Sequence, residues 1–385
     1  MAAGPSLNHN IAWLKEHKDE FIIIAASAIL NTLHKHNIKP DIVTQIDGFT
    51  REGSNCMVHL DGIDDVQTFL QDTIFVFGSH VPDMFVNLLK KENVFFLDDS
   101  ANYKGFGTLS TACVGSMSTL LAIKLGFSNI YLLGLDLAFD QKTGASHSDD
   151  HFQNNTYDLT KADETSHIIS LRDNIVQTEG NFSKIVYTTP DFLISIQVLA
   201  SEIPKLKDES QTIFNLNQGA YITDTQPTYP HNVSLKNQKI DKHLLYNKMF
   251  SLFTTYSASG LDQTGIAQMK QRLQNGYDIL ALINNYEKKT FMTTDKYMYD
   301  LLGIVSDILK SNNRKDSSII FIFTLYFRYA IPYIIDIENT KEATKLMPHF
   351  KKIDSALIEG MLNIIHRYIE GMETFLENYQ VKKTS

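Results

Sequence analysis

The chain has 385 residues, of which 43% are hydrophobic and 21% are charged. These proportions are typical of globular proteins and argue against disorder, and the length predicts about two or three domains. A formal net charge of -9 argues against a general binder of nucleic acid backbones. Two cysteines, Cys56 and Cys113, are too few for a disulfide framework or a Cys-rich zinc site, and they favour a reduced, cytoplasmic compartment.

Short apolar runs alternate with helical patterns in the first half of the chain. The expected elements are helix 7–14, strand 21–25, a helix capped by Ser27, strand 42–46, strand 74–77, a helix from Pro82, strand 94–97, helix 114–125, strand 130–133, strand 184–187 and helix 192–203. Such alternation predicts an α/β fold with a Rossmann-like, doubly wound and mostly parallel sheet. The turn at residues 2–7 resembles the end of a buried strand, yet no strand-forming residues precede it. We therefore expect the first strand to be missing.

The pattern changes beyond about residue 210. Residues 212–233 are rich in Asn, Gln, Thr, Pro and Gly, which predicts a loop bordering a site, and the rest of the chain is helical. We expect two domains, a sheet domain over residues 1–235 and an all-α domain over residues 236–385. The apolar stretch 319–337 has the length of a membrane span, but Arg328 and Pro332 interrupt it, so we expect a buried core helix there and no membrane span.

Ligands of parallel sheets bind outside the carboxyl ends of the strands, so the residues that follow each strand are the first candidates for a site. Here these residues are small, hydroxyl-bearing or acidic: Gly4-Pro5-Ser6, Ser27, Asp47, the segment 107–116, and Gly134-Leu135-Asp136. Amides and hydroxyls suit a phosphate, and carboxylates suit ribose hydroxyls or a metal, so the set predicts a nucleotide site. Each member also has a plain structural explanation as a turn, a helix cap or a packing residue, Thr111 and Ser116 included.

A polar segment, residues 146–151, follows the Gly134-Leu135-Asp136 strand end. His147 is the best candidate for a general base that activates a hydroxyl, and His151 and His167 are the next candidates. A surface histidine is the plain alternative for each. His147 and His151 have zinc-ligand spacing, but their context is loop-like, so no metal site is predicted. The dinucleotide and Walker glycine patterns are absent, which argues against a nicotinamide enzyme or a P-loop kinase.

The order of these motifs resembles the motility accessory factor (Maf) family of flagellin glycosyltransferases, whose core is similar to the archaeal 6-hydroxymethylpterin diphosphokinase (MptE-like) family. The resemblance is carried by Ala3-Gly4-Pro5-Ser6-Leu7, Ser27-Ala28, and residues 40–47, 125–136 and 215–222. It implies a sialyltransferase-like core that moves pseudaminic or legionaminic acid from its CMP-activated form to Ser or Thr of flagellin, for flagellum assembly and motility. It also implies that an N-terminal domain of the family is missing here.

The resemblance further implies which residues contact the donor. The nucleotide-binding residues would be Gly4, Pro5, Ser6, Ser27, Asp47, Thr111, Cys113, Val114, Gly115, Ser116 and Gly134. The first turn and residues 113–116 would hold the phosphate, and Ser27 and Asp47 would lie near the ribose or base. Asp136 would line the same cleft and is a catalytic candidate with His147, whose assignment rests on chemistry alone. Flagellin and a CMP-nonulosonic acid are the expected partners, and no cofactor is required.

Two other functions stay open at this point. One is a pyrophosphokinase-like enzyme that uses ATP and magnesium, with Asp47 and Asp136 as the metal ligands. The other is a non-catalytic module in which the helical third binds flagellin.

Overall fold

The computed structural model describes residues 1–48, 56–97, 109, 111–162, 174–235, 238–258, 260–310, 318–339 and 347–382. The chain divides into a sheet unit, which ends at Ser257, and a helical unit, which starts at Ala258. The boundary expected at residue 235 therefore lies later. The reason is helix α7 (Lys242–Tyr256), which buries Tyr246 and Met249 in the core of the sheet unit.

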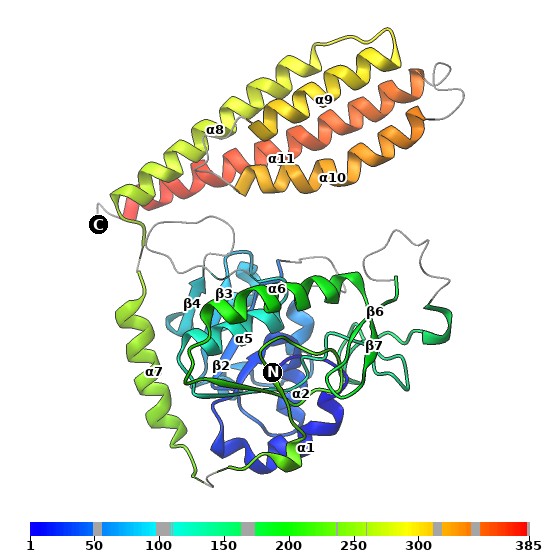
Figure 1. Cartoon of the computed structure of the whole chain (residues 1–385). Coiled ribbons are helices and arrows are strands. Elements are labelled where there is room, and N and C mark those ends of the chain that lie inside the picture. Colours follow the sequence, from blue (N-terminus) through cyan, green and yellow to red (C-terminus); the bar gives the residue numbers. More distant parts are fainter. Residues whose placement is uncertain are drawn as a thin grey trace. The chain divides into compact units, whose positions relative to one another are not determined.

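Helices and strands alternate through the sheet unit (Figure 1). The strands are β1 (Ile24–Ala26), β2 (Ile42–Gln45), β3 (Ile74–Gly78), β4 (Val94–Leu97), β5 (Asn129–Leu132), β6 (Val176–Glu179), β7 (Ile185–Thr188), β8 (Thr212–Asn215) and β9 (Gln226–Pro227). The α-helices before α7 are α1 (Leu7–His17), α2 (Leu30–Lys35), α3 (Val66–Phe69), α4 (Asp83–Val86), α5 (Val114–Lys124) and α6 (Pro190–Leu206). A short 3₁₀ helix, η3 (Cys56–Leu60), precedes α3.

Two groups of parallel strands form the main sheet. Strands β1, β2, β3 and β4 pair in that order, and β5 pairs with β8, which pairs with β9. Met1 and Ala2 lie between β1 and β5, where the first strand was expected to be missing. The Met1 amino group donates to the carbonyl of Ile24 at 2.7 Å, and the Ala2 amide donates to the carbonyl of Leu133 at 3.0 Å. The prediction of a Rossmann-like, mostly parallel sheet followed by helices is confirmed.

Alternate side chains of the strands enter cores on opposite faces of the sheet, as expected of a sheet covered on both sides. Ile42 and Ile74 belong to a core shared with α5 and α6. Val43 and Phe75, their neighbours in sequence, belong to the core on the other face, with residues of α2 and α4. Figure 1 shows α5 and α6 side by side, and the two helices contact each other. The unit is thus a helix, sheet, helix sandwich.

Two expected elements differ from the structure. The strand expected at 184–187 is β7, which pairs antiparallel with β6 in a separate two-stranded sheet. Residues 212–215, expected in a loop, form β8 of the parallel sheet. The polar Asn215 interrupts the apolar pattern of β8, and it is fully buried because Asn217 and the carbonyl of Ala220 satisfy its amide.

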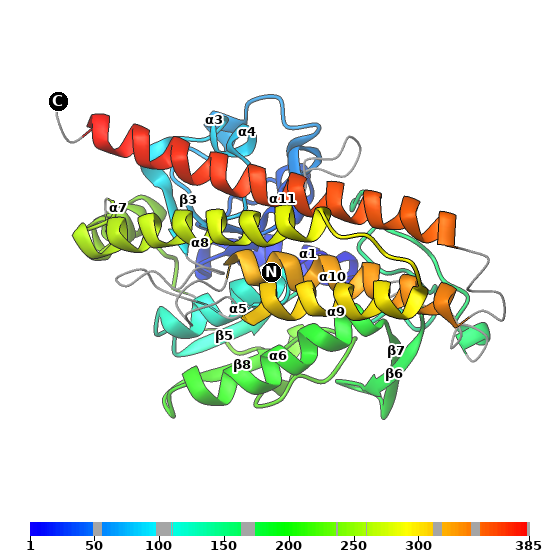
Figure 2. The ribbon, with the colours of Figure 1, turned by 90° about the horizontal axis from the view of Figure 1, so that it is seen from above.

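The described residues of the helical unit form four long helices. They run lengthwise beside one another (Figure 2). They are α8 (Gln263–Glu287), α9 (Thr294–Lys310), α10 (Ser318–Glu338) and α11 (Met347–Lys382). Their apolar faces meet in one core, which includes Ile283, Leu301, Phe323 and Ile365. A partly buried hydrogen bond links α8 and α11, since Tyr286 donates to Asp354 at 2.9 Å.

Helix α10 contains the apolar stretch that was expected to be a buried core helix. Phe323 and Phe327 are buried, but Tyr329 and Tyr333 on other sides of the helix are exposed. Only 22% of the stretch Ile319–Ile337 is buried, so the helix packs by one face rather than all round. Within the described residues, this is the one helix long and apolar enough to cross a membrane.

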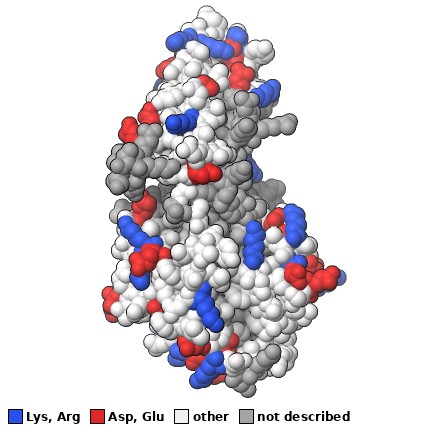
Figure 3. Space-filling model, turned by 90° about the vertical axis from the view of Figure 1, so that its left-hand side faces the viewer, with Lys and Arg blue, Asp and Glu red and all other residues white. Residues whose placement is uncertain are grey.

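Charged side chains are interspersed over the face that Figure 3 displays. Acidic and basic groups alternate there, without a broad field of one sign. That arrangement differs from the continuous basic surface by which proteins bind nucleic acid backbones.

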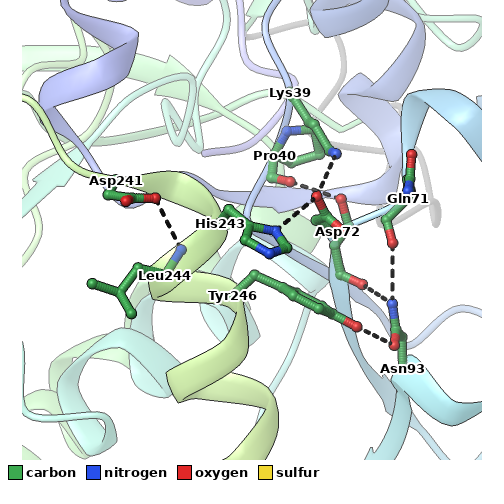
Figure 4. Close-up of polar contacts among 10 residues, drawn as sticks. Lys39, Pro40, Gln71, Asp72, Asn93, Asp241, His243, Leu244 and Tyr246 are labelled. Carbon is green, nitrogen blue, oxygen red and sulfur yellow. Dashed lines mark hydrogen bonds and ion pairs between the residues drawn. The ribbon is translucent and has the colours of Figure 1, made fainter.

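Polar contacts fix α7 on the sheet unit (Figure 4). The Tyr246 hydroxyl donates to the side-chain carbonyl of Asn93 at 2.8 Å, and Asn93 donates in turn to the carbonyl of Thr73 at 3.0 Å. One turn earlier, Lys242 forms an ion pair with the buried carboxylate of Asp41 at 2.6 Å. These bonds hold α7 against the residues that immediately precede β2, β3 and β4.

The Tyr246 bond can be tested by removing its hydroxyl. We expect Tyr246→Phe to destabilise the sheet unit by about 1 to 3 kcal/mol, because the buried Asn93 oxygen loses its donor. The single tryptophan, Trp13, packs in the sheet unit, so its fluorescence during urea unfolding reports that unit alone. Tyr256→Phe is the matched control, since Tyr256 lies on the same helix with 84% of its surface exposed. Equal unfolding midpoints for the two variants would contradict the role of the bond.

Candidate functional site

A cavity of about 510 Å³ lies at the carboxyl ends of β1, β2 and β5. The strand order reverses between β1 and β5, so the cavity occupies the position where parallel α/β sheets bind ligands. Its lining includes Gly4, Ala26, Gln45, Asp47, Cys56, His59, Cys113, Val114, Gly115, Gly134, Asp136, His147, His151, Phe152, Thr189 and Phe192. Its volume is in the range of small-molecule sites.

A larger cavity of about 810 Å³ lies elsewhere in the sheet unit. It is lined by residues 22–24, by residues 127–133 and by part of the segment 234–248. None of the residues predicted to bind a nucleotide or to catalyse lines it. The smaller cavity therefore is the candidate site.

The first turn is held by Asp136. One carboxylate oxygen of Asp136 accepts from the amide of Ser6 at 3.1 Å and from its hydroxyl at 2.8 Å. A Cβ at Gly4 would lie 2.2 Å from that oxygen and 2.6 Å from the carbonyl of Gly134, so only glycine fits there. Burial raises the pKa of Asp136 to about 6. The contacts make Asp136 a support for the turn, and its catalytic role stays a prediction.

The segment 215–219 forms hydrogen bonds with the same two turns and packs closely against them. The Asn217 side-chain oxygen accepts from the amide of Leu135 at 3.0 Å and lies 3.3 Å from the hydroxyl of Ser6. Gly219 passes so close to Asp136 that a Cβ there would meet its carbonyl oxygen at 2.2 Å. Two loops far apart in sequence thus form one buried polar network.

Helix α5 begins at the cavity. The Cys113 sulfur accepts from the amide of Ser116, and the Ser116 hydroxyl oxygen accepts from the amide of Cys113 at 3.0 Å. This capping box fixes the helix start, whose positive dipole end suits an anion. At Gly115 a Cβ would lie 2.5 Å from the Leu135 side chain, so the helix approaches the end of β5 as closely as glycine permits.

Ser27 does not cap the helix that follows it. Its hydroxyl, fully buried, lies 2.9 Å from Nδ1 of His59, which comes from η3. Burial lowers the pKa of His59 to about 4, so its ring is neutral at pH 7. His59 lines the cavity, whereas Ser27 does not. Ser27 therefore contacts a residue that lines the cavity, His59, and does not line the cavity itself.

Aromatic rings continue from His59 along one wall. Phe152 lies 5.6 Å from the ring centre of His59 and 4.9 Å from that of His151. His151 stacks on His147 at 4.2 Å, with the rings 11° from parallel. Burial and the neighbouring histidines lower the pKa of His151 to about 3. The Nδ1 atom of His147 lies 3.0 Å from the Ser146 hydroxyl, which orients the ring of the proposed base.

The structure brings most of the sequence-predicted residues to the cavity. Those that line it are Gly4, Asp47, Cys113, Val114, Gly115, Gly134, Asp136, His147 and His151. Those outside the lining are Pro5, Ser6, Ser27, Thr111 and Ser116. The predicted residues 107, 108, 110 and His167 lie outside the described part of the chain. Sequence reasoning missed Gln45, His59 and Phe152, and only the position of Gln45 at a strand end gave a usable signal.

Metal binding has no support from side-chain clusters. In the ranges that the structure describes, no group of three or more His, Cys, Asp and Glu side chains is placed to hold an ion. Asp136, a ligand in the magnesium-dependent alternative, already accepts two hydrogen bonds from Ser6.

Comparisons with known proteins agree with this architecture. Residues 1–142 match the sequence model of the "6-hydroxymethylpterin diphosphokinase MptE-like" family. The fold is similar to that of a Maf glycosyltransferase from Magnetospirillum magneticum AMB-1, with a TM-score of 0.57 and 16% sequence identity over 98% of this chain. The match spans 54% of that protein's chain, about half of its length. No curated protein matches the sequence. The chain thus combines a segment that matches the MptE-like family model with a fold similar to that of a Maf glycosyltransferase.

The buried His59 predicts a pH dependence of stability. A histidine whose pKa falls from 6.5 in the unfolded chain to about 4 in the folded one contributes stability that is complete above pH 6.5 and is lost as the pH falls towards 4. Between pH 7 and pH 5 we expect a loss of about 2 kcal/mol from this group. Asp136 acts in the opposite direction below pH 6, so the effect is read as a difference between variants.

The measurement is urea unfolding followed by Trp13 fluorescence at pH 5, 6 and 7. His59→Gln should lose less stability than the unsubstituted protein as the pH falls. His36→Gln, outside the cavity, should follow the unsubstituted protein. Parallel curves for all three proteins would refute a buried neutral His59.

Proposed function

We propose that the protein is a glycosyltransferase that moves a nonulosonic acid, pseudaminic or legionaminic acid, from its CMP-activated form to Ser or Thr hydroxyls of flagellin. The observation that carries the proposal is the cavity at the strand ends, where the start of α5 and the ring of His147 line one space. The fold likeness to a Maf glycosyltransferase supports it. We further propose that the reaction is cytoplasmic and needs no cofactor.

The proposed chemistry is a single displacement. The acceptor hydroxyl oxygen forms a bond to the anomeric carbon of the sugar, and the bond from that carbon to the CMP phosphate oxygen breaks. The electron pair leaves with CMP, whose charge is stabilised by the amides at the N-terminus of α5. His147 takes the hydroxyl proton, and its contact with Ser146 holds the ring in place.

Transfer can be measured by the mass of flagellin after incubation with CMP-pseudaminate or CMP-legionaminate. We expect the addition of the sugar mass, and His147→Gln should slow it by about 100-fold to 10,000-fold, the range of a general base. His231→Gln is the control, since His231 is exposed and lies outside the cavity lining. Flagellin that co-purifies with the protein but gains no sugar would favour a non-catalytic binding module.

The MptE-like match favours one alternative, an enzyme that uses ATP and magnesium with Asp47 and Asp136 as ligands. Thermal unfolding with each ligand separates the two proposals, because a ligand stabilises only the fold that binds it. We expect CMP at 100 times its Kd to stabilise the sheet unit by about 2.7 kcal/mol, and ATP with magnesium to have a smaller effect. Stabilisation by ATP with magnesium and none by CMP would reverse the assignment.

A further inference from the structure

A buried amide at the end of β2 has a thiol, a weak acceptor, beside its donor. The side-chain oxygen of Gln45 accepts from the amides of Ile46 at 3.0 Å and of Asp47 at 3.4 Å. These two donors fix which end of the amide is oxygen. The nitrogen, Nε2, therefore points the other way, towards the Cys56 thiol, a weak acceptor whose pKa burial raises and the Gln45 amide lowers. Among the described residues, Nε2 has no oxygen or nitrogen acceptor. Gln45 is fully buried and lines the cavity.

His59 supplies a second donor to the lining of the same cavity. In the described part of the chain, Nδ1 of His59 is the acceptor within reach of the Ser27 hydroxyl, at 2.9 Å. The hydroxyl hydrogen is satisfied when Ser27 donates to Nδ1, and the neutral ring then carries its proton on Nε2. Ser27 is thus a positioning residue that makes His59 a donor.

The two donors share the cavity with aromatic rings. Gln45 and His59 both line the cavity with Cys56, and the Phe152 ring lies 5.6 Å from that of His59. A planar ligand group that stacks on the Phe152 ring would present its polar edge to neutral N–H donors. Such a site fits a ring with two adjacent acceptors.

We propose that Gln45 and His59 select the base of the donor nucleotide by donating to O2 and N3 of cytosine. This inference rests on the proposed function, since it assigns the base end of the CMP-sugar. Cytosine presents two adjacent acceptors, whereas uracil carries a hydrogen on N3 that faces a donor. A site with two donors at these positions accepts CMP and rejects UMP, because the mismatched N–H groups lose their partners.

The test compares the binding of CMP and UMP, without any sugar, to the full chain by calorimetry. We expect the unsubstituted protein to bind CMP about 10- to 100-fold more tightly than UMP, the range of a well-placed pair of hydrogen bonds. Gln45→Glu replaces the donor with an acceptor of the same shape, so the preference should vanish or turn towards UMP. Gln71→Glu is the matched control, because Gln71 is exposed and lies outside the cavity lining, and it should keep the preference.

Each outcome decides one proposal. Equal binding of CMP and UMP by the unsubstituted protein, or an unchanged preference in folded Gln45→Glu, would overturn the base assignment and leave the glycosyltransferase proposal standing. Binding of neither nucleotide would instead contradict the proposed function. Trp13 fluorescence checks that Gln45→Glu is folded. If it is not, His59→Phe, which keeps a ring and removes the donor, takes its place with the same expected loss of preference.

Discussion

The cavity depends on the hydrogen bonds between Asp136 and Ser6. They join two turns that are 130 residues apart in sequence and that flank the point where the strand order reverses. A buried carboxylate is costly unless donors satisfy it, and the amide and hydroxyl of Ser6 do so at one oxygen. Burial still disfavours the ionised form of this carboxylate, since it raises the pKa of Asp136 to about 6.

The close approach of the two turns determines which residues can lie beside Asp136 and Ser6. Gly4, Gly134 and Gly219 all approach neighbouring atoms at distances where a Cβ would collide, so the turns come together only as bare backbone. Gly134 also has a positive φ of +67°, a conformation that favours glycine. The small residues that suggested a phosphate site from sequence therefore have a first role in packing. The space that they leave open, beside the start of α5, is what makes an anion site available.

The sequence predicted β2, β3 and β4 to within a residue, because β3 and β4 are short apolar runs and β2 begins as one. It failed at β8, where Asn215 is buried by hydrogen bonds rather than by apolar contact. It also failed at Ser27, whose local pattern fits a helix cap equally well. The contact with His59 forms only when η3 returns across 32 residues of chain, and no local pattern encodes such a contact.

The cavity is lined by the N-terminus of α5, which carries the positive end of the helix dipole, and by neutral hydrogen-bond donors. Burial lowers the pKa of His59 to about 4 and that of His151 to about 3, so at pH 7 these rings contribute hydrogen bonds and stacking surface but no charge. Under the proposed function, attraction for the phosphate comes from the start of α5, while the buried amide of Gln45 and the ring of His59 act by matching hydrogen bonds to the base. Charge attracts many anions alike, whereas an unmatched buried donor rejects the wrong ligand. Under the proposed function, phosphate attraction and base selection are therefore separate tasks of separate residues, and each can be removed without the other.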